Sequence, residues 1–137
     1  MPNAAKLSGQ TPVQLRYTGL VPSGVTLRGS WGYDTQSAGA GDYRAYVSYG
    51  ADFGAALTAE YAGTGTTTHC TGSVNTPTAQ GGFVCFYIFP SPGGVSSLNA
   101  INGSALNTRW GSAMQLNVNA AAGADVFANG TWAATAP

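Results

Sequence analysis

The sequence is poor in charge. Of its 137 residues, five are basic and five are acidic, so the formal net charge is zero and the charged fraction is 7%, against about 25% in an average soluble domain. Phosphate backbones and anionic lipid surfaces are bound by clusters of lysine and arginine. The basic residues here are spread along the whole chain, as Lys6, Arg16, Arg28, Arg44 and Arg109. We therefore expect no nucleic-acid partner and no membrane partner.

Side chains that carry chemistry are also scarce. The chain has one histidine, His69, and two cysteines, Cys70 and Cys85. A structural zinc site takes four ligands, and the serine of a hydrolase triad often sits in a Gly-x-Ser-x-Gly motif, which this sequence lacks. The five carboxylates follow no calcium-loop pattern. The sequence therefore predicts a protein that is not an enzyme and that has no catalytic residues, metal or cofactor.

Long hydrophobic runs are missing too. The longest, Phe83 to Phe89, has seven residues, whereas a membrane-spanning helix needs about 20. The first residues lack the basic start and apolar centre of a secretory signal, which favours a protein made without export. A composition rich in Thr, Ser and Gly instead favours exposure to the outside. A virion component released by lysis satisfies both expectations.

What the sequence does contain is apolar-polar alternation between clusters of Gly, Pro, Asn and Ser, which is typical of β-strands. Strand-like segments are residues 12–18, 25–31, 43–49, 55–61, 66–71, 83–89, 112–119 and 125–134. We predict an all-β fold: one antiparallel β-sandwich of about eight strands, either jelly-roll or immunoglobulin-like. It would span residues 12–137, after an N-terminal arm at 1–11. Residues 95–107 are compatible with a strand and turn or with a short helix.

Three segments give more specific expectations. Residues 12–18 and 25–31 predict a hairpin whose turn is at 20–24. The segment 83–89 is apolar on both faces, so both faces must be covered. The dipeptide Asn129-Gly130 indicates either a hairpin turn or a bulge within one strand.

The two cysteines lie in successive predicted strands. A disulfide bond between Cys70 and Cys85 would close a loop of about 15 residues and stabilise the fold by about 3 kcal/mol. The alternative is a pair of buried, reduced thiols, which are common in protein cores. Neighbouring residues on a strand point to opposite faces, so His69 is expected on the surface beside a core Cys70.

The aromatic residues provide the candidate contact residues. Trp31 and Trp132 follow the apolar face of their strands and are expected in the core. The side chains assigned to loops or to outward positions are Tyr33, Tyr46 and Trp110. Aromatic faces of this kind stack on sugars. In an assembly protein, Tyr46 and Phe86 would instead contribute to a symmetric protein interface.

The chain has a neutral charge, the doubly apolar segment 83–89 and no catalytic cluster. In these respects it resembles the small β-rich accessory proteins of bacteriophage particles. That family includes capsid decoration, head-spike and tail proteins. The resemblance covers the whole chain and rests on composition and strand pattern, so no functional residue is carried over. It implies a non-enzymatic structural protein located in the virion, whose partners are protein subunits and which forms homo-oligomers. The alternative is a carbohydrate-binding module or an adhesion module, secreted or on the bacterial cell surface, with glycans as partners.

Overall fold

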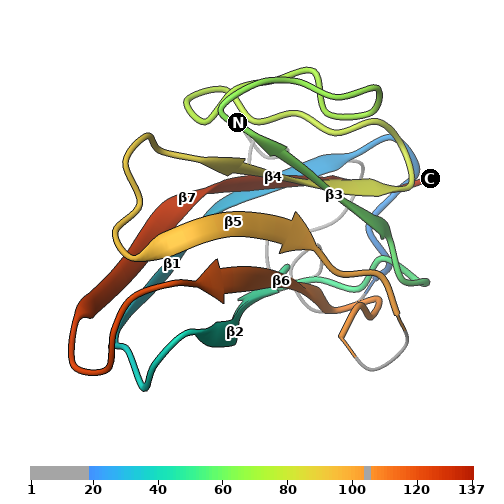
Figure 1. Cartoon of the computed structure of the whole chain (residues 1–137). Helices are drawn as coiled ribbons and strands as arrows, with labels where there is room; N and C mark the ends of the chain where they lie inside the picture. Colours follow the sequence, from blue (N-terminus) through green and yellow to red (C-terminus); the bar gives the residue numbers. More distant parts are fainter. Residues whose placement is uncertain (1–18, 104–105) are drawn as a thin grey trace, which may run out of the picture.

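The computed structural model describes residues 19–103 and 106–137, which form seven β-strands in two sheets (Figure 1). The strands are β1 (Thr26–Gln36), β2 (Gly41–Ser48), β3 (Thr58–Gly63), β4 (Phe83–Ile88), β5 (Val95–Ala100), β6 (Gly111–Val118) and β7 (Asp125–Thr135). One sheet has the order β1-β7-β4-β3 and the other the order β2-β6-β5. In this part of the chain no helix has the length and apolar character to cross a membrane. The predicted all-β class is confirmed.

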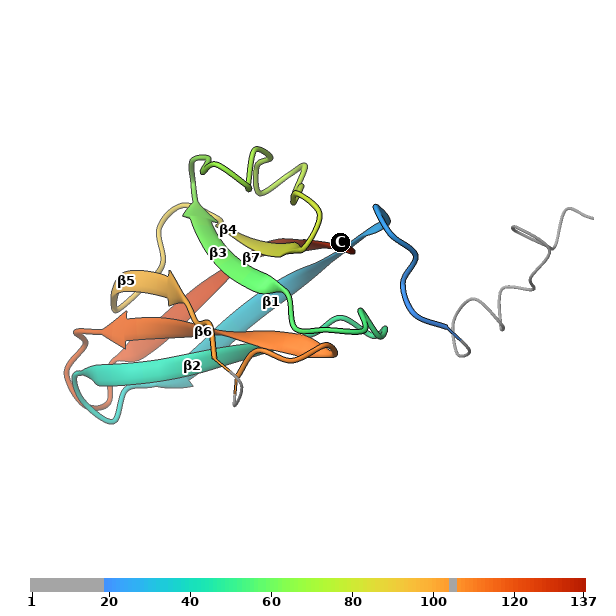
Figure 2. The same ribbon diagram turned by 90° about the vertical axis from the view of Figure 1, so that its right-hand side faces the viewer.

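The two sheets share one hydrophobic core. Trp31, Phe86 and Trp132 of the four-stranded sheet belong to the same buried cluster as Met114 and Leu116 of the three-stranded sheet. Figure 2 shows β3 and β4 above β2, β5 and β6. Burial of the inner faces of two sheets in one core is a main source of stability for a domain of this size.

The predicted alternation is confirmed in β2, but Val25, expected on the apolar face of its strand, is 40% exposed. In β2, Ala45 and Val47 are buried, whereas Arg44 and Tyr46 are exposed. The segment 95–107, for which the sequence allowed a strand or a helix, begins with strand β5. The predicted strand at 12–18 and the arm at 1–11 lie outside the described residues.

Strand β4 is buried on both faces, as the sequence predicts. Val84, Phe86 and Ile88 belong to the main core, and Cys85 and Tyr87 belong to a second buried cluster. The assignment of Phe86 to an exposed interface is therefore wrong, because its side chain is 0% exposed. Alternation along the strand places Phe86 on the inner face.

The outer face of β4 is covered by the segment 64–82, which connects β3 to β4. These two strands are parallel, so the predicted purely antiparallel arrangement is wrong for this pair. A parallel pair requires a crossover of a dozen or more residues that passes over one face of the sheet. This crossover therefore supplies the second cover that β4 needs, without a partner chain.

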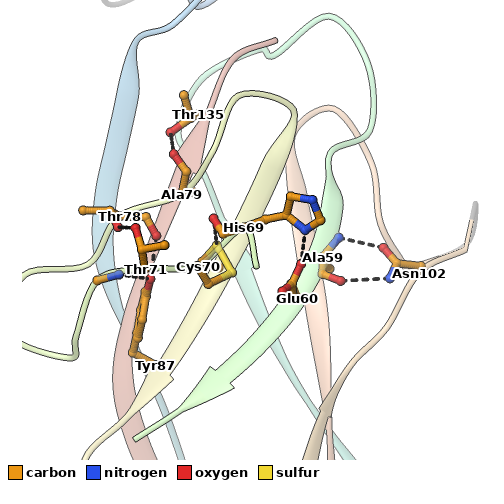
Figure 3. The surroundings of a disulfide bond; sticks show 12 residues. Ala59, Glu60, His69, Cys70, Thr71, Thr78, Ala79, Tyr87, Asn102 and Thr135 are labelled. Atoms are coloured by element: carbon orange, nitrogen blue, oxygen red, sulfur yellow. Dashed lines mark hydrogen bonds and ion pairs between the residues drawn. A yellow bond between two sulfur atoms is a disulfide. The ribbon is translucent and has the colours of Figure 1, made fainter. Parts of the chain in front are cut away.

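Covalent and hydrogen bonds fix the crossover to the sheet (Figure 3). Of the two states that the sequence left open for the cysteines, the structure contains the disulfide bond between Cys70 and Cys85. The Tyr87 hydroxyl accepts a hydrogen bond from the Gly72 N–H at 3.0 Å and donates one to the Thr78 carbonyl at 2.6 Å. Two backbone groups of this irregular segment are thus bonded to a side chain of the sheet below.

The prediction of a strand at 66–71 is wrong. In the structure this stretch belongs to the crossover and has no strand partner. Its backbone bonds stay within the crossover: the Thr67 N–H donates to the Cys70 carbonyl at 2.9 Å, and the Gln80 N–H donates to the His69 carbonyl at 2.9 Å. The β-branched threonines favour extended backbone, but a connection that crosses a sheet has no neighbouring edge to pair with.

The antiparallel pairing of β1 with β7 places a tryptophan opposite a glycine at two positions. Trp31 lies opposite Gly130, and Trp132 lies opposite Gly29. The Trp31 indole N–H passes close to Gly130 and donates to the Tyr87 carbonyl at 3.0 Å. Asn129-Gly130 is therefore neither a turn nor a bulge, because β7 continues through it in register. A glycine is required there to let an indole and a neighbouring backbone approach.

Replacing this glycine tests its role. A Cβ atom at Gly130 would clash with the Tyr87 carbonyl and the Trp31 indole, whereas a Cβ atom at Gly32, on the neighbouring strand β1, meets nothing within 4 Å. We expect Gly130→Ala to lower the free energy of unfolding by about 2–3 kcal/mol through overpacking, and Gly32→Ala to change it by less than about 0.5 kcal/mol. Urea denaturation measures both. Equal effects of the two substitutions would contradict this account.

Candidate functional site

The exposed aromatic side chains Tyr46 and Trp110 lie beside one shallow pocket. Tyr46, on the outer side of β2, is 66% exposed, and Trp110, just before β6, is 53% exposed. They become neighbours because β2 and β6 pair with Ser48 opposite Gly111. The pocket has a volume of about 290 Å³. Its remaining lining residues are Val47, Ser48, Leu106, Thr108, Gly111 and Ser112.

Backbone and side-chain contacts hold Trp110 in place. Its carbonyl accepts the Tyr49 N–H at 2.9 Å, and the neighbouring Arg109 carbonyl accepts the Phe53 N–H at 3.1 Å. The Arg109 guanidinium carbon lies 5.1 Å from the centre of the indole ring, a cation–π distance. Arg109 also forms an ion pair with Asp52 at 3.0 Å. The indole is therefore presented to solvent by a fixed turn.

Of the four aromatic residues that the sequence singled out, the structure brings only Tyr46 and Trp110 together. Tyr33 is half-buried and packs edge-to-face on Tyr43, with ring centres 6.1 Å apart. Phe86 is in the core. We refer to Tyr46, Trp110 and the pocket between them as the aromatic pocket.

A second hollow, of about 460 Å³, lies between the two sheets. Residues 61–65, at the end of β3, line one side, and residues 95–98 of β5 line the other. Residues 88–92 also line it. Strand patterns alone do not predict this hollow, because it depends on which strands end each sheet. Only the strand order shows that β3 and β5 are both edge strands.

The single histidine forms part of a small cluster beside the disulfide bond (Figure 3). His69 Nδ1 lies 2.8 Å from Glu60 Oε2, and the imidazole ring stacks on Phe83 with ring centres 3.9 Å apart. Cys70 is fully buried, and His69 is partly exposed. Burial opposes ionisation of Glu60, but the neighbouring Thr67 hydroxyl and His69 outweigh it, so the pKa of Glu60 is lowered.

Four ionisable groups of the described residues form two separate ion pairs. Glu60 pairs with His69, and Asp52 pairs with Arg109. Among residues 19–103 and 106–137, no three His, Cys, Asp or Glu side chains are placed to hold a metal ion. The aromatic pocket is suited to noncovalent binding: two aromatic faces offer apolar area, and the hydroxyls of Ser48 and Thr108 lie along its lining.

Comparisons with family models, with curated proteins and with solved structures found no match to this chain.

The Glu60–His69 pair predicts a specific pH dependence. The pKa of Glu60 is lowered in the folded state, so its carboxylate stabilises the fold above the pKa of the unfolded chain, and this contribution is lost as the pH falls through the lower folded value. We expect Glu60→Gln to cost less than about 1 kcal/mol at pH 7. The difference from the parent should shrink at pH 3, as measured by urea denaturation.

Asp34→Asn provides the control, since Asp34 is exposed on β1 and forms no ion pair with any described residue. A Glu60→Gln deficit that is constant or grows on acidification would show that Glu60 acts through packing and not through its charge.

Proposed function

We propose that this chain is a non-enzymatic structural protein that binds other protein subunits through the aromatic pocket. We further propose that it is an accessory component of a bacteriophage virion, as a capsid decoration, head-spike or tail protein. The observation that carries the first proposal is the joint exposure of Tyr46 and Trp110, at 66% and 53%, around one pocket. Of the three tryptophans, the other two are each 5% exposed.

The energetics of interfaces support this use of the pocket. Tyrosine, tryptophan and arginine are the side chains that most often dominate binding energy. Tyr46 and Trp110 line this pocket, and Arg109 lies against the Trp110 indole. The turn that holds Trp110 is already bonded to its neighbours through its backbone, so little loop freedom remains to be lost on binding. A formal net charge of zero adds little long-range repulsion between copies.

The virion setting is supported by the compositional resemblance described above. Virion shells are built from repeated protein contacts, which a chain of zero formal net charge permits. Symmetric homo-oligomers are the commonest assemblies of soluble proteins. We therefore propose a homo-oligomer as the assembled form.

We also propose that the fold is a β-sandwich of the jelly-roll class and not the immunoglobulin-like class. The support is the nested pairing of the strands. The first described strand pairs with the last, β1 with β7, and the second pairs with the second-last, β2 with β6, in the other sheet. Such pairing results when a long hairpin folds over to form two sheets, as in a jelly roll.

Carbohydrate binding is the alternative, and one observation favours it. The exposed indole of Trp110 is flanked by the Asp52–Arg109 ion pair and by Thr108. A pyranose ring needs an aromatic face for its apolar side and polar neighbours for its hydroxyls. The pocket offers both, so a glycan-binding module, or an adhesion module on a bacterial surface, is our second candidate.

Self-association tests the first candidate. We expect light scattering and sedimentation to show an oligomer that Trp110→Ala weakens about tenfold or more. Val25→Ala is the matched control, because Val25 is 40% exposed but lies outside the aromatic pocket, and it should have less than about twofold effect. A parent protein that stays monomeric at high concentration would exclude a homo-oligomer formed through this pocket.

A glycan array separates the two candidates. An assembly protein should give no glycan signal. A carbohydrate-binding module should bind a defined sugar class, lose that binding in Trp110→Ala, and keep it in Val25→Ala. Trp110 is the exposed tryptophan, so its fluorescence should shift when the aromatic pocket is filled, which gives a second measurement of either kind of binding.

A further inference from the structure

The hollow between the sheets is bordered by two strand edges. Strand β3 ends the four-stranded sheet, and β5 ends the three-stranded sheet. The Asn102 side chain closes one end of the gap between β3 and β5 (Figure 3). The Ala59 N–H donates to Asn102 Oδ1 at 2.7 Å, and Asn102 Nδ2 donates to the Ala59 carbonyl at 2.9 Å. An amide side chain here takes the place of a neighbouring strand.

Farther along, the same edge borders the hollow. The backbone groups of Ala59 point away from β4, and residues two apart on a strand have the same orientation, so those of Tyr61 point into the hollow. On the other side, the Ile101 N–H donates to Ala113 on β6. Leu98 is three residues before Ile101, so its backbone groups point away from β6 and towards the hollow. Edges of this kind are templates for an added strand.

The dimensions suit a strand. Residues 61–65 and 95–98 line opposite sides of the hollow. The length of these two segments matches about four residues of an added extended chain, at about 3.3 Å per residue. Leu98 is 7% exposed and Tyr61 is half-buried, so the inner part of the hollow is apolar. An inserted strand would place one row of side chains on these residues and the other row towards solvent.

We propose that residues 12–18 of a second copy of this chain bind in the hollow as an additional β-strand between β3 and β5. This segment alternates Val13, Leu15 and Tyr17 with polar residues, the pattern that a strand with one buried face requires. Pro12 stands at its first position, where the missing N–H is tolerated. The inference names a partner for the proposed function and rests on it in taking this chain to be an assembly protein.

The strand must come from another copy because its own chain cannot reach. Leu20 pairs with Asp52. Asp52 forms an ion pair with Arg109, so Leu20 lies near the start of β6. Val95, which lines the hollow, pairs with Val118 at the end of β6. Strand β6 spans about 23 Å between these points. Leu15 is only four residues from Gly19, within about 14 Å.

The figures agree with this separation. Figure 2 shows the coloured ribbon beginning, in blue, on the opposite side of the molecule from the end of β3 and the start of β5. Donation of residues 12–18 is therefore head-to-tail: each copy gives a strand at one end and receives one at the other. Head-to-tail contacts form a closed ring if the rotation closes, and a filament if it does not.

Crosslinking between two separately purified full-length variants tests the proposal. One carries Leu15→Cys in the donated segment, and the other carries Thr64→Cys, an exposed position that lines the hollow. The native cysteines are joined in the disulfide bond, so a short bismaleimide reagent reacts with the new thiols. We expect a crosslinked pair containing one copy of each variant. The control replaces Thr64→Cys with Arg44→Cys, exposed on β2 at the far edge of the sheet that contains β5, and should give at least about tenfold less product.

Sedimentation of single variants gives a second measurement. Leu15→Asp should weaken self-association about tenfold or more, because it places a charge against an apolar surface, whereas Gln14→Asp, on the polar face of the same segment, should have less than about threefold effect. Equal crosslinking of Thr64→Cys and Arg44→Cys, or equal effects at positions 14 and 15, would overturn the inference. If these fail while Trp110→Ala still breaks an oligomer, the proposed function stands without strand donation.

Discussion

The other features of this structure depend on one constraint: both faces of β4 must be buried against other parts of the protein. A strand in which Cys85 and Tyr87 are as buried as Val84 and Phe86 must have protein on each side, and the inner sheet packing supplies only one of them. The chain supplies the other by running β3 and β4 parallel, because their connection then has to pass over the outer face. The crossover, its disulfide bond and the hydrogen bonds to the Tyr87 hydroxyl follow from that pairing.

This pairing also determines the edges of the sheets. Strand β3 is the last strand of the four-stranded sheet, beside β4, and residues of β3 and β5 line the two sides of the hollow. Asn102 closes part of that gap and leaves the rest as the hollow. The opposite end of the molecule carries the aromatic pocket, which depends on the antiparallel pairing of β2 with β6. The two surfaces that we propose for assembly thus have independent structural origins.

Much of the fold could be predicted from the sequence, because strand alternation reflects a local property: which side chains face the core. The alternation in β2 and the double burial of β4 are both read from neighbouring residues. Features that depend on long-range pairing could not be predicted in this way. The threonines at 66–68 favour extended backbone, yet their segment crosses a sheet instead of joining one. Gly130 resembled a turn residue, but its role depends on Trp31, on another strand.

The candidate site was predictable to the same degree. Outward positions such as Tyr46 follow from alternation, and Trp110 follows from its place in a turn. Phe86 did not fit, because a strand that is apolar on both faces gives no signal for which side is the interior. The proximity of Tyr46 and Trp110 required the register of β2 and β6, and the hollow required the full strand order.

The burial of the disulfide bond has one more consequence. Both cysteines are 0% exposed, and exchange needs a thiolate to reach a sulfur atom directly. A small reductant must therefore wait until the crossover lifts from the sheet, and the bond breaks no faster than that local opening occurs. Once formed, the crosslink is protected kinetically, so the folded protein can retain it after transfer into surroundings whose equilibrium would favour free thiols.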